Sequence, residues 1–429
     1  STGRSTDNPL LSLAQPGAFA SPCRSPMPQP TIFVAATRQH VGKTTVSLAL
    51  MSGLQKRFNK VGFLKPVGQQ HLPVRDESGN QLRVDKDVQV MKEYFKLDHV
   101  PYSAMSPVII PSGYTARYID GEVSNEAQCA AIRRAHETIS SGSDVVLAEG
   151  TGHVGVGSVV EVSNARAAAM MGAEVVLVAN GGIGKAFDEL EMNRMMFAHE
   201  GVRVRGVVLN KVRPDKVEYV RSKMGRLLEQ RWGVPLLGVV PELSYLSKPT
   251  LAELERALDG DLLAGHRCRS LHYGVENSFL VTTGLRRFLR RAFEQRSPSE
   301  WRRPLFVTHV TRDDLLLGYL AQHQRLMTAQ GGAVDGPRDW AGAMVLSTGA
   351  SKGFPDKEAF PDDTEPLTYL TQMAKDSNAP VLITRYGTLD ALHIIESYTA
   401  KHSIHDTARV SAAVAHYEPN IDFDALLQG

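Results

Sequence analysis

The chain has 429 residues, of which 42% are hydrophobic and 22% are charged, and its formal net charge is +2. This length exceeds what one compact core usually serves, so two domains are expected. The small net charge argues against a protein that coats nucleic acid, and no apolar run of about eighteen residues is available to span a bilayer.

Residues 1–30 differ from the rest of the chain in composition. They are rich in Ser, Pro and Ala, they contain one acidic residue, Asp7, and the chain begins without Met. Such a segment buries too little apolar surface to fold by itself. Two interpretations are open: the trimmed remnant of an organellar leader, which would place the protein in the mitochondrial matrix or the plastid stroma, or the disordered tail of a cytoplasmic protein.

Residues 31–257 alternate short apolar runs with amphipathic stretches. Six runs have the length and composition of buried strands: TIFVAA (31–36), VGFLK (61–65), DVVLAE (144–149), EVVLVAN (174–180), RGVVLN (205–210) and PLLGVV (235–240). Helices are expected between them, for example over Val46–Phe58, Asp87–Phe95 and Pro214–Trp232. The alternation predicts an α/β fold with a doubly wound, mostly parallel sheet covered by helices.

Residues 258–429 repeat this alternation on a smaller scale. Strands are predicted for LFVTHV (305–310), AMVLST (343–348) and PVLITR (380–385), with a helix after each. The stretch LDGDLLAGHRCRS (258–270) has turn residues and little periodicity, so the boundary between the two domains is predicted there.

The sequence ATRQHVGKTT (36–45) follows the first predicted strand and precedes a predicted helix. In such a P-loop, or Walker A motif, glycine lets the backbone approach phosphate oxygens, lysine neutralises them, and a hydroxyl holds Mg²⁺. Gly42, Lys43 and Thr44 match these three roles. The motif therefore predicts binding of ATP and Mg²⁺, with nucleotide contacts from Arg38, Val41, Gly42, Lys43, Thr44 and Thr45.

The loop departs from the usual pattern at its start. Ala36 and Thr37 stand where a glycine normally begins the turn, and alanine fits there only if the backbone avoids positive φ. Arg38 lies four residues before Gly42, where some dimeric P-loop ATPases carry an extra lysine. Arg38 either compensates by reaching a phosphate or is a solvated side chain at the loop shoulder.

Further motifs follow in a specific order: LKPVGQQ (64–70), VDKDVQVM (84–91), VVLAEGTGH (145–153) and VVLNKV (207–212). With the P-loop, this order resembles the dethiobiotin synthetase group of P-loop proteins, which is related to the ATP-binding domains of cobyrinate amidases. Residues 149–189 resemble more closely a BioD-like domain joined to a DRTGG domain, as found ahead of the catalytic domain in long bacterial phosphate acetyltransferases.

The resemblance implies roles for residues that match the family motifs. Thr44, Asp87 and Glu149 would hold the metal ion, and their oxygens suit Mg²⁺ that also bridges phosphates. As the alternative, Asp87 and Glu149 are simply residues at a helix start and a strand end, although the carboxyl edge of a parallel sheet is where ligands bind.

The catalytic residues implied by the resemblance are Lys43 and Lys65. Lys65 resembles the lysine that meets the acceptor substrate or the γ-phosphate, while the alternative is a lysine whose stem is buried at a strand end. Asn210 resembles an asparagine with which the family reads adenine. An amide suits this role because it both donates and accepts hydrogen bonds. Pro241 lies where the family brackets the base.

The match fails at the acceptor pocket and is loose in the second domain. Gly68 and Gln69 stand where the family offers a small hydroxyl residue, and Arg38 replaces an acidic residue, so biotin precursor synthesis is disfavoured. In THVTRDDLLLGYL (308–320), Arg312 and Asp313 match the DRTGG signature, but its glycines are missing.

Two functions remain open, and the sequence does not decide whether the protein is an enzyme. The altered loop and acceptor pocket favour an ATP-binding and Mg²⁺-binding regulatory or scaffold component. The alternative is an ATP-dependent ligase that forms an amide or carbamate with an unknown acceptor. The expected partners are a nucleotide and either a second copy in a homodimer or the other subunits of a larger assembly.

Overall fold

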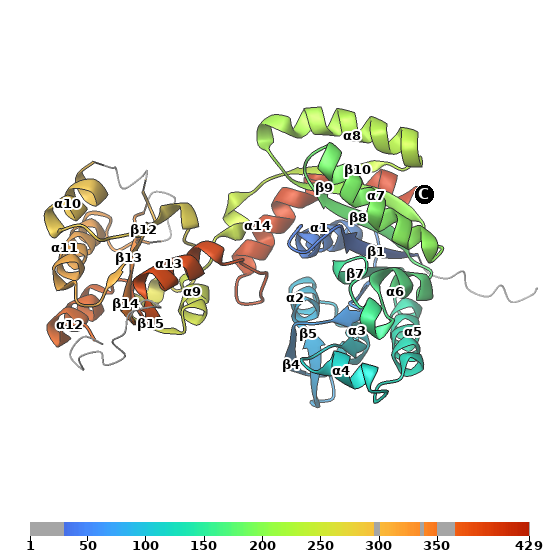
Figure 1. Ribbon diagram of the computed structural model, residues 1–429, viewed down its shortest axis with the longest axis horizontal. Helices are drawn as coiled ribbons and strands as arrows, with labels where there is room; N and C mark the ends of the chain where they lie inside the picture. Colours follow the sequence, from blue (N-terminus) through green and yellow to red (C-terminus); the bar gives the residue numbers. More distant parts are fainter. Residues whose placement is uncertain (1–29, 296–300, 335–338, 350–364, 429) are drawn as a thin grey trace, which may run out of the picture.

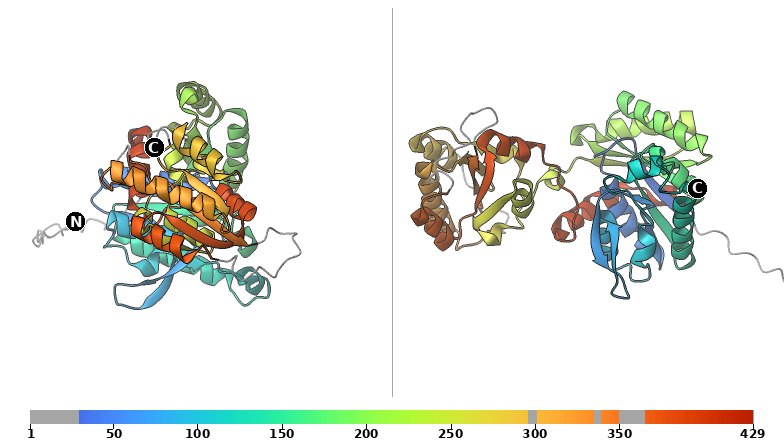
Figure 2. Two further views of the ribbon diagram at one scale, coloured as in Figure 1. Left: turned by 90° about the vertical axis from the view of Figure 1, so that its left-hand side faces the viewer. Right: turned by 60° about the horizontal axis from the view of Figure 1, so that its bottom comes forward.

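The computed structural model describes residues 30–295, 301–334, 339–349 and 365–428. They form two α/β bodies joined by a narrow neck (Figure 1, Figure 2). The predicted fold class is confirmed: a mostly parallel central sheet covered by helices is followed by a second, smaller α/β region. The segment predicted as a leader, residues 1–30, lies outside the described residues except for Pro30.

The sheet of the first body has six parallel strands in the order β10-β9-β8-β1-β7-β2. Its strands are β1 (Thr31–Ala36), β2 (Val61–Leu64), β7 (Val145–His153), β8 (Glu174–Asn180), β9 (Val204–Val212) and β10 (Leu236–Pro241). All six residues of β1 are buried, because helices cover both faces of the sheet. The strand order reverses at β1, and open α/β sheets bind ligands at such a point.

Helices of the first body lie on both faces of this sheet. They are α1 (Lys43–Gln55), α2 (Lys86–Phe95), α3 (Tyr102–Met105), α4 (Tyr114–Ile119), α5 (Asn125–Ser141), α6 (Asn164–Met170), α7 (Gly184–His199), α8 (Val217–Trp232), α14 (Thr407–Tyr417) and α15 (Phe423–Leu427). α1 packs against α2 and α14, whereas α6 packs against α5 and α7. No helix among the described residues has the length and apolar character needed to cross a bilayer.

A small layer inserted after β2 brings acidic residues to the carboxyl edge of the sheet. β3 (Val67–Gly68) pairs with β6 (Val108–Ile109), and β4 (His71–Arg75) forms a hairpin with β5 (Gln81–Asp85). The Asp85 side chain accepts a hydrogen bond from the Asp87 N–H and so caps α2. The hairpin therefore fixes where α2 begins.

The second body has a five-stranded sheet in the order β11-β15-β14-β13-β12, with only β11 antiparallel. Its strands are β11 (Gly260–Ala264), β12 (Ser278–Leu280), β13 (Leu305–His309), β14 (Ala343–Gly349) and β15 (Val381–Gly387). Its helices are α9 (Leu251–Ala257), α10 (Leu285–Leu289), α11 (Asp313–Ala329), α12 (Thr368–Ser377) and α13 (Thr388–Ser397). Rings of Phe306, Tyr319 and Trp340 pack in its core.

The structure divides the chain differently from the predicted boundary between residues 31–257 and 258–429. The second core already includes Leu251 and Leu254, and the stretch predicted as a boundary contains the edge strand β11. After α13 the chain returns to the first body, where Val410 and Phe423 join the first core. The periodicity of a short helix shows that it has an apolar face but not which body that face covers.

A substitution of Phe423 tests whether the C-terminal segment that includes α15 belongs to the first core. Its ring fills the space in which a Cβ on Gly53 would lie, and the Arg57 guanidinium lies 4.4 Å from the ring centroid. Phe423→Ala should lower the free energy of unfolding of the first body by about 3–5 kcal/mol, because it leaves a cavity against α1. Hydrogen exchange should show faster exchange of the α1 amides and unchanged exchange of β13 and β14.

The control is Leu280→Ala, since the Leu280 side chain is 39% exposed on the edge strand β12. Its effect on the α1 amides should be negligible. Equal acceleration in both bodies after Phe423→Ala, or none in α1, would contradict the assignment of this segment.

Candidate functional site

A cavity of about 670 Å³ lies at the carboxyl edge of the first sheet, where β1 leads into α1. Its walls include the loop residues 38–45, Lys65 after β2, residues 85–87 at the start of α2, and residues 398–402 of the segment returning from the second body. This position is the point at which the strand order reverses.

The loop before α1 is held by the end of β9. Gly42 has φ of 97°, and a Cβ there would overlap the Asn210 side chain, so glycine is required for two reasons. Asn210 Nδ2 donates a hydrogen bond to the Val41 carbonyl at 2.7 Å, and Lys211 Nζ donates to the His40 carbonyl at 2.8 Å. These bonds fix the path of the loop. The first N–H groups of α1 have no acceptor within the helix, and they lie at its cavity end.

The start of the loop needs no glycine because Ala36 is still a strand residue. His40, at φ of 60°, takes the left-handed conformation instead. The Thr37 N–H donates to the Val178 carbonyl at 3.0 Å, and the Thr37 hydroxyl donates to Glu189 Oε2 at 3.1 Å. Arg38 Nε lies 3.6 Å from the same Glu189 oxygen, so this carboxylate holds the loop shoulder.

Below the loop, a buried ammonium group lies among three carboxylates. Lys65 Nζ contacts Asp87 and lies 3.2 Å from Asp85 Oδ1 and 3.6 Å from Glu149 Oε1. Burial by itself lowers the pKa of Lys65, but the three carboxylates outweigh burial and hold the pKa above its usual value. Burial likewise opposes ionisation of Asp87, while Lys65 and other lysines hold the pKa of this carboxyl below its usual range. Lys65 and Asp87 are therefore both charged at neutral pH.

Glu149, at the middle of β7, connects this cluster to the P-loop. Its Oε1 accepts a hydrogen bond from the Thr44 hydroxyl at 2.8 Å and lies 4.0 Å from Lys43 Nζ. Burial raises the pKa of Glu149, with Lys65 opposing the shift, and burial lowers the pKa of Lys43, with Glu149 opposing it. Burial thus disfavours the charged form of both groups, and each charge favours the other.

The oxygens of this cluster fit Mg²⁺ bound together with phosphate. Glu149 Oε2 is buried and has no hydrogen-bond partner, and the Thr44 hydroxyl lies 3.4 Å from Asp87 Oδ2. Among the described residues, no group of three or more His, Cys, Asp or Glu side chains is arranged to hold a metal by itself. Mg²⁺ at nucleotide sites uses few carboxylates and takes its other ligands from waters and phosphates, which agrees with this arrangement.

Comparison with known proteins gives the family. A family model described as an AAA domain matches residues 30–250. The chain belongs to this AAA domain family. The AAA domain contains the P-loop, the carboxylate cluster and all six strands of the first sheet. Its P-loop fold is that of nucleotide-binding proteins.

The relatives of the AAA domain include two kinds of protein. The chain is 28% identical to a phosphate acetyltransferase of Nitrosomonas europaea over 54% of this chain and 32% of that protein. It is 27% identical to a phosphate acetyltransferase of Nitratidesulfovibrio vulgaris over 70% of this chain and 40% of that protein. It is 25% identical to the ATP-dependent dethiobiotin synthetase BioD of Xanthomonas axonopodis pv. citri over 50% of this chain and 92% of that protein. The chain thus spans well under half of the phosphate acetyltransferases it matches.

Most of the predicted site residues lie together in the AAA domain. Those that line the cavity are Arg38, Val41, Gly42, Lys43, Thr44, Thr45, Lys65 and Asp87. Glu149 is fully buried behind Thr44. Asn210 and Pro241 do not line the cavity: the Asn210 amide supports the loop, and the Pro241 carbonyl lies 2.9 Å from His416 Nε2. Their predicted roles at the base stay predictions.

Several cavity residues were not predicted from the sequence. Lys401 and His402 reach the AAA domain from the far end of the chain: His402 Nε2 lies 2.9 Å from the Thr45 hydroxyl. Lys86 and Lys211 also line the cavity. Lys86 and Lys211 each follow a motif residue directly, so the sequence could have indicated that they lie at the site. Residues 398–402 resemble no motif, and nothing in the sequence indicated them.

A substitution of Lys65 tests whether its ammonium group balances the three buried carboxylates around it. Lys65→Met should lower the free energy of unfolding by about 3–5 kcal/mol, because it leaves three buried carboxylates without their shared cation. Mg²⁺ should raise the melting temperature of this variant more than that of the wild-type protein, since a divalent cation would replace the lost charge. Thermal unfolding with and without Mg²⁺ measures both effects.

The matched control is Lys223→Met on α8, where the lysine is exposed. It should leave stability and its response to Mg²⁺ unchanged. A Lys65→Met variant as stable as the wild type would show that the cluster does not hold these elements together.

Proposed function

We propose that this protein binds ATP with Mg²⁺ in the P-loop cavity and acts as a nucleotide-dependent regulatory or scaffold component. The observation that carries the proposal is the joint placement of Lys43 and Thr44 at the start of α1, directly above Glu149 and Asp87. A helix N-terminus with a lysine and a hydroxyl above carboxylate oxygens is suited to a phosphate chain that shares a divalent cation.

The charges of the cavity wall favour a ligand with several negative charges. Its basic side chains are Arg38, Lys43, Lys65, Lys86, Lys211 and Lys401. Its acidic side chains are Asp85, Asp87 and Glu242. A triphosphate chain would balance this excess. In this proposal Lys43 binds phosphate oxygens, and Thr44, Asp87 and Glu149 hold Mg²⁺, which supplies further positive charge to the phosphates.

A regulatory role is supported by the acceptor side of the cavity. The N–H groups of Gln69 and Gln70 both donate to Asp85 Oδ2, at 3.1 and 3.3 Å. These N–H groups therefore already bind a carboxylate of the protein itself. Gly68 offers no side chain to an acceptor, and a Cβ there would meet the Asp85 Cβ at 2.8 Å. Residues 398–402 form another part of the wall. The second body is thereby connected to the place where a nucleotide would bind.

The alternative, an ATP-dependent ligase, is favoured by the position of Lys65. Lys43 and Lys65 line the same cavity, and their ammonium groups lie 4.0 and 3.6 Å from Glu149 Oε1. Two ammonium groups so placed would stabilise negative charge on a transferred phosphoryl group. The relative named ATP-dependent dethiobiotin synthetase, matched over 92% of its length, adds support to this alternative.

Three further parts of the proposal concern the rest of the chain. We propose that the second body is a DRTGG-like domain. Residues 308–320 resemble the DRTGG signature loosely, and VLSTGASKGFPD (345–356) and APVLITRYGTLDALHIIE (379–396) resemble the later part of that domain better. Residues 350–356 lie outside the described part of the chain. The interior of a mitochondrion or plastid is proposed as the location from the composition of residues 1–30, with the cytoplasm as the alternative. A homodimer or a larger assembly is proposed as the state of the protein.

Nucleotide binding is tested with Lys43→Ala. The variant should bind Mg-ATP about 10- to 100-fold more weakly than the wild type, because it loses a charged hydrogen bond to phosphate. Isothermal titration calorimetry of the full chain measures the dissociation constant. Lys223→Ala is the matched control and should bind as the wild type does. Equal affinity of the Lys43→Ala variant and the wild type would rule out the site.

Turnover separates the two functions. A regulatory component should bind Mg-ATP and release no phosphate over many equivalents of protein, whether or not amines and bicarbonate are added. A ligase should release phosphate in proportion to an added acceptor, and Lys65→Ala should abolish that release. Phosphate release assayed with a panel of diamines and carboxylates decides between them.

A further inference from the structure

The return segment, residues 398–406, connects α13 of the second body to α14 of the first body. Five of its residues, 398–402, line the P-loop cavity. Nothing in the P-loop motif requires a wall from this part of the chain. The return segment therefore joins the candidate nucleotide site to the second body.

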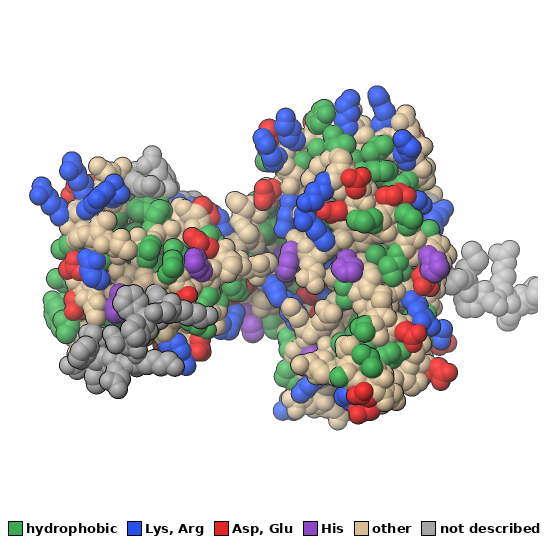
Figure 3. All heavy atoms as spheres, viewed as in Figure 1, with side chains coloured by type: hydrophobic (Ala, Val, Ile, Leu, Met, Phe, Trp, Pro, Cys, Tyr) green, Lys and Arg blue, Asp and Glu red, His purple; other side chains and the backbone are tan. Residues whose placement is uncertain are grey.

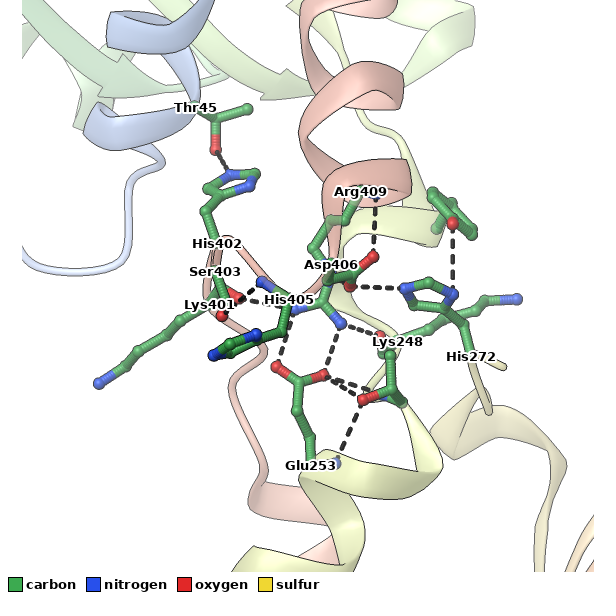
Figure 4. Close-up of polar contacts among 12 residues, drawn as sticks. Thr45, Lys248, Glu253, His272, Lys401, His402, Ser403, His405, Asp406 and Arg409 are labelled. Atoms are coloured by element: carbon green, nitrogen blue, oxygen red, sulfur yellow. Dashed lines mark hydrogen bonds and ion pairs between the residues drawn. The ribbon is translucent and has the colours of Figure 1, made fainter. Parts of the chain in front are cut away.

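Two side chains of the return segment contact different parts of the cavity wall. His402 Nε2 lies 2.9 Å from the hydroxyl of Thr45, in the first turn of α1 (Figure 4). Lys401 Nζ donates a hydrogen bond to Gln70 Oε1 at 3.0 Å, next to the β4–β5 hairpin. The segment thus bridges the P-loop side and the acceptor side of the cavity.

A buried ion-pair network fixes the path of the return segment. Arg409 is fully buried, and its guanidinium donates to both Glu253 oxygens at 3.1 and 2.6 Å. It also donates to the Lys401 carbonyl at 2.8 Å and to the Lys248 carbonyl at 2.9 Å, as Figure 4 shows. One side chain therefore holds the outgoing segment, the returning segment and α9 of the second body together.

A second carboxylate completes this network. Asp406 Oδ2 lies 3.0 Å from Arg409 Nε and 2.8 Å from His272 Nε2, and His272 follows the second body's β11. Separation of the two bodies at the neck would remove both Glu253 hydrogen bonds from the buried Arg409 guanidinium, which is strongly unfavourable. The Lys401 backbone is thus held by a contact that depends on the second body. Figure 3 shows that the molecule narrows between its two bodies.

Charge at the cavity mouth indicates what the segment binds. Lys401 and Lys86 both line the cavity, and Lys401 is exposed toward it. Ammonium groups that line the same cavity repel one another, and an anion bound among them stabilises both.

We propose that the return segment supplies two residues to the nucleotide site: Lys401, which binds an anionic oxygen of the bound ligand, and His402, a positioning residue that holds Thr45 at the start of α1. Through Arg409 and Glu253, nucleotide binding is then coupled to the attachment of the second body. This inference rests on the proposed function. Because coupling is reciprocal, loosening the network weakens nucleotide binding, and nucleotide binding tightens the network.

The test uses the full chain and Mg-ATP. Titration calorimetry should give a dissociation constant about 5- to 10-fold larger for Lys401→Ala and for His402→Ala than for the wild type. The exposed lysine variant Lys223→Ala is the control and should equal the wild type. The partners of the two substituted side chains, Thr45 and Gln70, lie in the first body, so unchanged hydrogen exchange of β1 and β8, as well as of β13 and β14, should confirm that both variants are folded.

Hydrogen exchange with and without Mg-ATP tests the coupling. In the wild type, Mg-ATP should slow exchange in residues 398–406 and in α9. In Glu253→Gln, which weakens the pairing with Arg409, Mg-ATP should protect the P-loop but no longer protect α9. Loss of β13 and β14 protection would reveal a folding defect, and the Lys401→Ala and His402→Ala affinities then decide the matter alone.

The outcomes separate this inference from the proposed function. If the wild type does not bind Mg-ATP, both are wrong. If the wild type binds and Lys43→Ala does not, while Lys401→Ala and His402→Ala bind with wild-type affinity and residues 398–406 show no protection, the inference is overturned and the proposed function stands.

Discussion

The first body is organised around one buried ammonium group that three carboxylates share. Lys65 stands at the end of β2, and its partners come from the end of the β4–β5 hairpin, from the first turn of α2 and from β7. Because none of these charges can lose its partner in the interior without a large penalty, the four elements are fixed relative to one another. Glu149 then extends the cluster to Thr44 and so to the P-loop. The geometry of the site depends on this arrangement.

The path of the chain gives the second body its relation to the site. The second body lies between β10 and α14 in sequence, and both of those elements pack in the first body. Two segments therefore pass through the neck, and Arg409 bonds to both of them and to Glu253. A body attached by one flexible linker would move independently of the P-loop. Here a buried guanidinium and the return segment provide a direct mechanical connection to the start of α1.

Sequence patterns predicted the parts of the fold and site that depend on contiguous residues. β1 and β8 span the predicted runs TIFVAA and EVVLVAN, because strands buried on both faces are continuously apolar. The P-loop was predicted because its chemistry requires residues at fixed spacing. The edge strand β11 was missed, since an edge strand with mixed burial has a weak pattern. For Asn210, the sequence indicated a polar residue at a strand end but not that its amide is bonded to the Val41 carbonyl.

By itself, then, the sequence determined the α/β class and the P-loop, because each is encoded by spacing along a short stretch. The lysine and carboxylates at the sheet edge were predicted from the resemblance of short motifs to a known family, and parallel strands bring such residues to one edge. Only the tertiary structure decided that residues 398–428 return to the first body and that Lys401 and His402 enter the cavity. Thr45 and His402 are 357 positions apart in the chain. Contacts over such a separation depend on how two bodies and a neck pack together, and no local pattern of residues specifies that packing.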